Sequence, residues 1–290
     1  LDVMAEGDAK ALADDCAAAW GAKSETFGRF GTARLLLPGG ERLDLAQARA
    51  EDYTSPAALP AVRPATIEED LKRRDFTVNA MARLLTPDGI GEPLDPFGGA
   101  QDLAARRLRV LHEGSFKDDP TRLFRAARYA GRLGLAPDET TARLIKESVG
   151  RKDPGPLSRE RLRQELWRIL EEEDPDPALG LCAAWGLTGF LYQGFKTPEG
   201  LGKVPEALTR LGLIAFSLGA EGEGFVASFP FGRHESAALR AALLAAQGKA
   251  TPAQPLPGAA VKILRAALPE LPPTALCARL LTGADLVAKG

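Results

Sequence analysis

The spacing of apolar and polar residues divides the chain into a first part with short strand-like runs and a helical remainder. Up to about residue 110, apolar runs alternate with turns, and from residue 118 onward apolar residues recur at helical spacing. Glycine and proline interrupt the second pattern. Helices are predicted over 118–134, 138–149, 158–172 and 176–192, with more between 204 and 282, and loops over 219–224 and 252–257. This layout indicates an α+β fold, with a small mixed sheet followed by helices.

Within the first part, the pattern predicts one helix and one hairpin. Residues 1–4 end a strand, and the alanine-rich segment 8–20 has helical spacing. The runs 30–37 and 41–46 flank a Pro-Gly-Gly turn as a β-hairpin. After it, the proline-rich residues 52–65 are predicted to form a loop, residues 68–85 are helical or mixed, and 87–89 form a turn.

Composition narrows the class of protein. The chain has 290 residues, of which 45% are hydrophobic and 26% charged, as in globular proteins, and its length suggests about two domains. No apolar run is long enough to predict a transmembrane helix, and the N-terminus does not resemble a secretory signal. We therefore expect a cytoplasmic protein that does not insert into membranes.

Cysteine and histidine are too sparse for several kinds of site. Cys16, Cys182 and Cys277 are far apart, and His112 and His234 are distant from each other. This spacing excludes a disulfide framework, a cysteine or histidine zinc site and a Ser-His triad as leading explanations. The chemistry must then rest on carboxylates, arginines and metal ions with oxygen ligands.

Positive charge is concentrated in the middle of the chain. The net charge is −2, yet residues 103–168 contain 16 Lys and Arg against 9 Asp and Glu. A basic segment between acidic ends predicts a local site for a polyanion, although a solvated helical face would also carry such an excess.

Two acidic residues lie within predicted strands. Asp2 and Asp44 each stand between apolar neighbours, and Asp44 shares a strand face with Arg42. If the two strands are adjacent, both carboxylates point to one face of the sheet. Paired carboxylates of this kind hold Mg²⁺, although a solvated strand face also commonly carries Asp.

The predicted helix after residue 118 has an apolar face and an arginine face. On a helical wheel, one arc contains Leu123, Ala126, Ala127, Ala130 and Leu133, and a separate arc contains Arg122, Arg125, Arg128 and Arg132. Four arginines with no carboxylate among them would repel one another, which favours a bound anion.

Asp119 precedes Pro120 and has two possible roles. Asp is a preferred N-cap and Pro a preferred first helical residue, so Asp119 can simply cap the helix. Alternatively, Asp118 is the cap and Asp119 is available for chemistry.

These segments together resemble a known family. Residues 73–80 (RRDFTVNA) are similar to the RRDFT[IV]NA motif of the class II tRNA nucleotidyltransferase and bacterial poly(A) polymerase family. Further segments match in order: residues 1–9 resemble the end of the DxD strand, 42–49 the strand with the third carboxylate, 95–103 the segment that follows, 118–129 the [ED]DxxRxxRAxRF helix and 157–162 a later helical motif. The resemblance covers about residues 1–170.

The sequence also departs from the family pattern. The family's first motif, a Gly-Gly turn leading to Val-Arg-Asp, has no counterpart before Leu1, where the first Asp of DxD would lie. We therefore expect a chain that is truncated or partly recorded at its start. Asp118 stands where the family often has Glu.

The resemblance implies a domain order and a set of site residues. A nucleotidyltransferase palm domain would occupy residues 1–110, a helical neck with a nucleotide-selecting helix 111–170, and an RNA-binding helical body and tail 171–290. Catalytic Asp2 and Asp44 would be two of three carboxylates holding two Mg²⁺ ions. The remaining nucleotide-binding residues would be Arg74 and Asp75 at the ribose and phosphates, Asp119 and Arg122 at the base, and Arg125 and Arg128 at phosphates or supporting that pair.

The implied activity is template-independent addition of CMP, AMP or both, from CTP and ATP, to the 3′ end of tRNA. The motifs are shared with poly(A) polymerases and do not separate CCA, CC-only, A-only and poly(A) addition. A protein of another class, an RNA-binding module without catalysis, is a further alternative. The sequence does not predict an oligomeric state.

Overall fold

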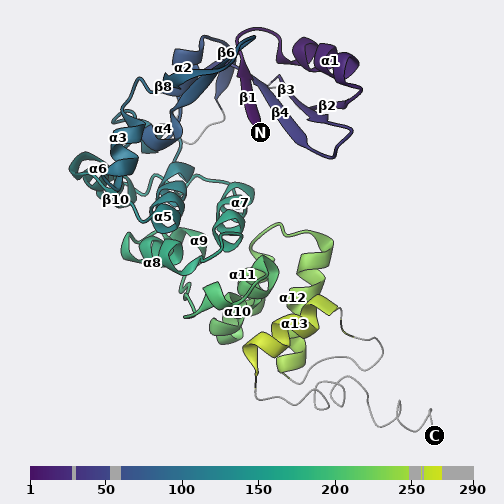
Figure 1. The fold of residues 1–290 in the computed structure, drawn as a ribbon. Coiled ribbons are helices and arrows are strands. Elements are labelled where there is room, and N and C mark those ends of the chain that lie inside the picture. The colour runs from purple at the N-terminus through teal and green to yellow at the C-terminus, as the bar shows by residue number, and fades with distance from the viewer. Residues whose placement is uncertain (28–30, 53–59, 248–255, 257, 270–290) are drawn as a thin grey trace, which may run out of the picture. The chain divides into compact units, whose positions relative to one another are not determined.

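The computed structural model describes residues 1–27, 31–52, 60–247, 256 and 258–269, which form two compact units (Figure 1). The first unit comprises residues 1–119 and 137–141, and the second comprises 120–136 and the described part of 142–290. The sheet lies in the first unit and the longest helices lie in the second, which confirms the predicted α+β class.

A four-stranded mixed sheet opens the first unit, with the strand order β1-β4-β3-β2. β1 runs parallel to β4, and the other neighbouring strands are antiparallel. The strands are β1 (Asp2–Ala5), β2 (Lys23–Phe27), β3 (Thr32–Leu36) and β4 (Arg42–Gln47). The predicted hairpin is β3–β4, whereas β2 was not predicted.

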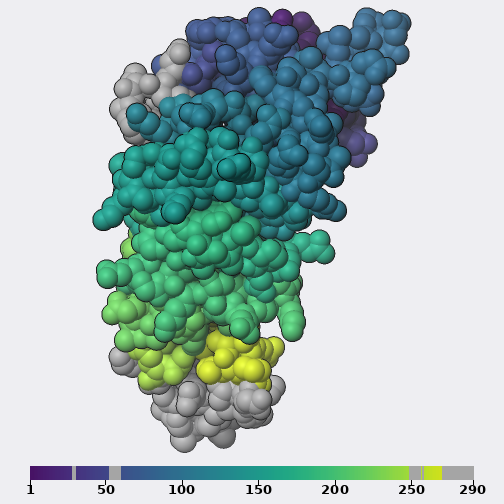
Figure 2. Space-filling view, turned by 90° about the vertical axis from the view of Figure 1, so that its left-hand side faces the viewer, coloured from purple at the N-terminus to yellow at the C-terminus, as the bar shows by residue number. Residues whose placement is uncertain are grey.

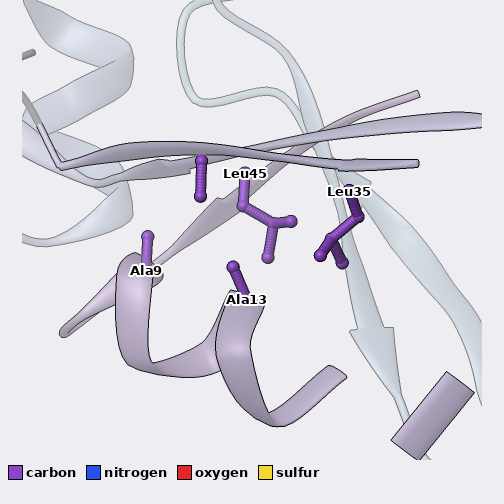
Figure 3. Packing of buried hydrophobic residues seen from close by; sticks show 5 residues of the cluster. Ala9, Ala13, Leu35 and Leu45 are labelled. Atoms are coloured by element: carbon purple, nitrogen blue, oxygen red, sulfur yellow. The ribbon is translucent and has the colours of Figure 1, made fainter. Parts of the chain in front are cut away.

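One face of this sheet is covered by helix α1 (Ala9–Trp20), as predicted from the apolar spacing. The helix begins where the Asp8 side chain accepts hydrogen bonds from the backbone N–H groups of residues 10 and 11. It ends at Gly21, whose φ of 63° favours glycine. Ala9 and Ala13 are fully buried against Leu35 and Leu45 (Figure 3). The small alanines let the helix approach the sheet closely.

The rest of the first unit consists of two small hairpins and short helices. Its elements are β5 (Arg49–Asp52), β6 (Ala61–Pro64), α2 (Ile67–Lys72), η1 (Thr77–Asn79), β7 (Ala82–Thr86), β8 (Gly89–Leu94), α3 (Gly99–Ala104), β9 (Arg107–Leu108), α4 (Ser115–Asp118) and β10 (Ala136–Pro137). The loop predicted over 52–65 is wrong at residues 61–64, because β6 pairs antiparallel with β5 there. Residues 53–59 of that loop lie outside the described part of the chain.

The second unit is built from helices. They are α5 (Thr121–Leu133), α6 (Glu139–Gly150), α7 (Arg159–Leu170), α8 (Asp176–Ala184), α9 (Thr188–Leu191), η2 (Leu201–Lys203), α10 (Ala207–Ser217), η3 (Gly219–Glu221), α11 (Gly222–Ala227), α12 (Arg233–Ala246) and α13 (Gly258–Ala267). In the space-filling view of Figure 2, the green and yellow atoms of this unit adjoin one another on the face turned to the viewer. The four helices predicted between 118 and 192 are present, and the last of them, predicted over 176–192, is divided into α8 and α9.

The loop predicted over residues 219–224 is wrong, because this segment forms η3 and the start of α11. Burial of Phe225 and Val226 outweighs the low helix propensity of the glycines. The loop predicted over 252–257 lies outside the described residues apart from residue 256.

The predicted apolar face of α5 forms the core of the second unit. Its residues Leu123, Ala126 and Ala127 are fully buried, and α5 packs against α7 and α8. Cys16 and Cys182 are free thiols, and burial raises the pKa of Cys182 to about 12. Cys277 lies outside the described residues. In the part of the chain that the structure describes, every helix is too short or too polar to cross a membrane.

Candidate active site

The sheet brings the two predicted catalytic acids together. The parallel register of β1 and β4 places Asp2 directly beside Asp44. Their strand neighbours Val3, Leu43 and Leu45 pack with α1, so the alternation of side chains puts both carboxylates on the opposite face of the sheet. The expected adjacency and shared face of the two acids are therefore present.

Two arginines on the same face bind the Asp44 carboxylate. Arg34 Nε lies 2.8 Å from Asp44 Oδ1, and Arg42 Nε lies 2.7 Å from Oδ2. These hydrogen bonds, first from Arg42 and then from Arg34, lower the pKa of Asp44 to about 2. The Asp44 carboxylate is thus ionised throughout the neutral range.

The donor set suits a hard divalent cation. Carboxylate oxygens are the ligands that Mg²⁺ prefers, and two of them project side by side from adjacent strands. A cation at Asp44 would exchange with at least one guanidinium, because each oxygen already accepts a hydrogen bond. Among the described residues, no group of three or more His, Cys, Asp or Glu is arranged to hold a metal ion.

Arg74 reaches the same face of the sheet. Its Nη2 lies 3.9 Å from the sulfur of Met4, which shares a strand face with Asp2. The guanidinium is oriented from behind, with Nη2 3.2 Å from Asp70 Oδ2 and Nη1 3.1 Å from the carbonyl oxygen of Asn79. The structure therefore brings a guanidinium to Met4, two residues along β1 from Asp2, on the sheet face that carries the paired carboxylates.

Asp70 is a functional candidate that the sequence reasoning missed. Its side chain is fully buried and accepts hydrogen bonds from the backbone N–H of Arg49, from Arg73 and from Arg74. It fixes both arginines of the RRDFTVNA segment. The available signal was the spacing, because an acid three and four residues before two arginines shares their helical face.

The Asp75 carboxylate is bound within its own segment. Its Oδ1 accepts hydrogen bonds from the backbone N–H of Phe76 at 2.9 Å and from Asn79 Nδ2 at 3.0 Å. The side chain is buried and stabilises the turn at η1. Its assignment to the nucleotide stays a prediction.

The arginine face of α5 contains an internal anion. Glu172 Oε1 lies 2.9 Å from Arg128 Nη1 and 3.6 Å from Arg132 Nη1. The guanidinium carbons of Arg125, Arg128 and Arg132 lie 5.5, 4.5 and 5.0 Å from the centre of the Tyr129 ring. Arg128 and Arg132 thus have a carboxylate partner within the chain, whereas an external anion at this face stays a prediction.

The arginines predicted to bind the nucleotide differ in how far they are exposed to solvent. Arg122 and Arg128 are buried, whereas Arg125 is half-buried. Arg128 is consequently a packed member of the second unit, and its expected contact with phosphate stays a prediction, as do those of Arg122 and Arg125.

Asp119 lies at the junction of the two units. Helix α5 starts at Thr121, and Pro120 occupies the cap position without a side-chain capping hydrogen bond. Asp119 lies one residue earlier, in extended conformation, and Asp118 Oδ2 is 3.9 Å from His112 Nε2. Asp119 belongs to the first unit and Arg122 to the second. The base-reading and capping roles of Asp119 both stay predictions.

Comparison with known proteins agrees with this geometry. Residues 1–109 match the poly(A) polymerase head domain family. The chain is 37% identical over 233 residues to the A-adding tRNA nucleotidyltransferase of Geobacter sulfurreducens, covering 79% of this chain and 26% of that protein. It is 38% identical over 201 residues to the CC-adding tRNA nucleotidyltransferase of Deinococcus radiodurans, covering 69% of this chain and 52% of that protein.

A solved structure matches nearly the whole fold. The apo form II of a CCA-adding enzyme aligns with a TM-score of 0.70 and 30% sequence identity, over 97% of this chain and 71% of that one. A mixed sheet with paired acids and a helical second unit thus define a nucleotidyltransferase fold. The chain belongs to the class II tRNA nucleotidyltransferase and bacterial poly(A) polymerase family. It spans about a quarter to about half of the length of the two curated relatives.

Proposed function

We propose that this protein transfers CMP, AMP or both, from CTP and ATP, to the 3′ end of tRNA without a nucleic-acid template. The observation that carries the proposal is the pairing of Asp2 with Asp44 on one face of the sheet, a face that Arg74 also reaches at Met4. The curated relatives, which are named for A addition and CC addition to tRNA, support this substrate class. A cytoplasmic location follows from that substrate.

Asp2 and Asp44 would be two of the three carboxylates that hold two Mg²⁺ ions. Bound cations lower the pKa of the attacking 3′-hydroxyl and stabilise charge on the pyrophosphate leaving group. Asp44 suits this role because its low pKa keeps it ionised. Arg74 neutralises phosphate charge, and Asp70 keeps its guanidinium oriented.

Base selection would rest on Asp119 and Arg122. A carboxylate accepts a hydrogen bond from the exocyclic amine of cytosine or adenine, and a guanidinium donates to the neighbouring ring nitrogen. Uracil and guanine place a carbonyl oxygen at the position of the amine, which leaves two acceptors facing each other. Such a mismatch costs about 1–3 kcal/mol in a desolvated site, which would disfavour both bases about 5- to 150-fold without a template.

Sequencing of reaction products tests the proposal and separates the alternatives. The natural protein that contains residues 1–290 is incubated with a tRNA transcript that lacks its 3′ CCA, together with CTP and ATP. The proposal predicts one to three added residues, limited to C and A, and then termination. A long A tract would instead identify a poly(A) polymerase, and unextended but bound tRNA would identify a non-catalytic RNA-binding module.

A further inference from the structure

Glu172 and Arg128 form an enclosed ion pair on the arginine face of α5. The Arg128 side chain is 10% exposed and that of Glu172 11%, and Arg128 Nη1 donates to Glu172 Oε1 at 2.9 Å. Glu172 follows the end of α7, 44 residues after Arg128. A single carboxylate therefore joins α5 to the segment that follows α7.

Glu172 is itself held in place from α10. Arg210, which is 3% exposed, donates hydrogen bonds to the carbonyl oxygens of residues 170, 172 and 173 on one side. On the other side it donates to the carbonyl oxygens of Leu201 and Val204. The backbone that carries Glu172 is thus fastened by a buried guanidinium and cannot shift without breaking several hydrogen bonds at once.

Arg128 shares an aromatic contact with two other arginines of α5. Arg128 lies over the Tyr129 ring at 4.5 Å, and Arg125 and Arg132 contact the same ring one turn before and after it. Arg122 and Arg125 fall on the same helical face. Arg122 precedes Arg128 by less than two turns of the same helix, so the contact that orients Arg128 acts close to Arg122, in addition to the core packing of α5.

We propose that Glu172 is a positioning residue for nucleotide selection, acting through Arg128 on the helix that presents Arg122. The proposal rests on the proposed function, in which α5 reads the base. A buried ion pair is weak evidence of a stabilising role, since apolar residues of similar volume often replace both partners without loss of stability. In this proposal the ion pair keeps the arginine face of α5 in one orientation. Removal of the Glu172 charge should therefore change nucleotide selection.

The test compares Glu172→Gln with Glu171→Gln in the full chain. Both substitutions remove one negative charge, at neighbouring positions. Glu171 is exposed, and its Oε1 accepts a hydrogen bond from Trp167 Nε1 at 2.7 Å, away from the arginine face. Glu172→Gln should raise the KM for CTP and ATP about tenfold or more, the usual effect of removing a residue that orients a ligand-binding side chain. It should also reduce the preference for CTP and ATP over UTP and GTP. Glu171→Gln should leave both unchanged.

Hydrogen–deuterium exchange of residues 121–133 and titration of the four NTPs provide readouts that do not depend on turnover. The proposal predicts faster exchange of α5 and weaker, less selective nucleotide binding in Glu172→Gln only. Equal selection and equal α5 exchange in the two variants would overturn it, even if the Tm of Glu172→Gln falls. If the unsubstituted protein shows no transfer activity, the proposed function is refuted instead. The exchange and binding measurements would still decide the role of Glu172.

Discussion

At the scale of single residues, the charge of Asp44 is set by its strand position. Pairing of β3 with β4 places Arg34 directly opposite Asp44, and Arg42 lies two residues away on the same face. Hydrogen bonds from Arg42 and Arg34 lower the pKa of Asp44 from 3.8 to about 2. The carboxylate is therefore kept ionised at neutral pH by its own neighbours in the sheet.

This shift predicts a pH dependence of stability. Because the folded-state pKa of Asp44 is depressed, its contribution is fully present above the unfolded-state pKa near 4 and is lost as the pH falls toward about 2. Asp44→Asn should be less stable than the unchanged protein at pH 7, and the gap should close between about pH 4 and pH 2. Urea unfolding at a series of pH values measures it. A gap that is constant down to pH 2 would contradict the assignment.

Asp119 and Arg122 carry the prediction for specificity. Arg122→Ala should slow addition of CMP and AMP while tRNA affinity stays nearly unchanged, because a base contact is lost and not a tRNA contact. Asp119→Ala should in addition relax discrimination against UTP and GTP. Single-nucleotide incorporation beside a thermal melt checks both variants. If Asp119 is only an N-cap, its replacement should lower stability by about 1 kcal/mol and leave the nucleotide preference as it was.

At the scale of elements, helix α5 depends on a close approach to α8. A Cβ added at Gly131 would lie 2.6 Å from the backbone nitrogen and 2.9 Å from the Cα of Ala178. Backbone atoms cannot move aside as a flexible side chain can, so the two helices would have to separate. This explains a glycine inside a helix, where it is otherwise unfavourable.

Gly131→Ala should therefore destabilise the protein by about 1–3 kcal/mol, the usual cost of overpacking. Gly180, inside α8, is the matched control, because a Cβ added there meets nothing within 4 Å. Gly180→Ala should be neutral or stabilise the protein by up to about 1 kcal/mol. Chemical denaturation of both variants decides the matter, and equal effects of the two substitutions would contradict the packing argument.

The sequence predicted helices and strands where a single apolar periodicity was clear. The predictions failed where tertiary contacts determine the secondary structure. The helix 8–20 and the hairpin around residues 38–40 follow from local pattern and turn residues. Strand β6 was not predicted because the prolines around it indicate a loop. The start of α11 was not predicted because its glycines disfavour a helix, whereas burial of Phe225 and Val226 stabilises one.

For the site, the same division holds. Asp2 and Asp44 were predictable because alternation in a strand fixes their face. The support from Asp70 and Glu172 was not, since the Asp70 network includes the backbone of Arg49, 21 residues away, and Glu172 meets Arg128 across 44 residues. Contacts of that kind arise only when the chain has folded.

At the scale of the whole molecule, the basic excess of residues 103–168 is partly compensated. Glu172 and Asp102 lie just outside this range and pair with arginines inside it: Arg128, Arg132, Arg107 and Arg109. The proposed contacts of this segment with RNA phosphates would release counterions on binding.

The affinity for tRNA should accordingly fall steeply with salt. A linear decrease of log K with log salt, with a slope equivalent to several phosphate contacts, is expected between about 50 and 200 mM. Fluorescence anisotropy with labelled tRNA measures the slope. A binding constant that stays flat over this range would show that the basic segment does not bind the RNA backbone.

The most direct test of the account is single-nucleotide incorporation by the natural protein that contains residues 1–290. A tRNA transcript lacking its 3′ CCA, and transcripts ending in C and CC, are each offered one of the four NTPs with Mg²⁺. The account predicts addition of CMP or AMP to at least one of these ends, little or no addition of UMP or GMP, and no addition by Asp44→Asn. Addition of all four nucleotides alike, or unchanged activity of Asp44→Asn, would contradict it.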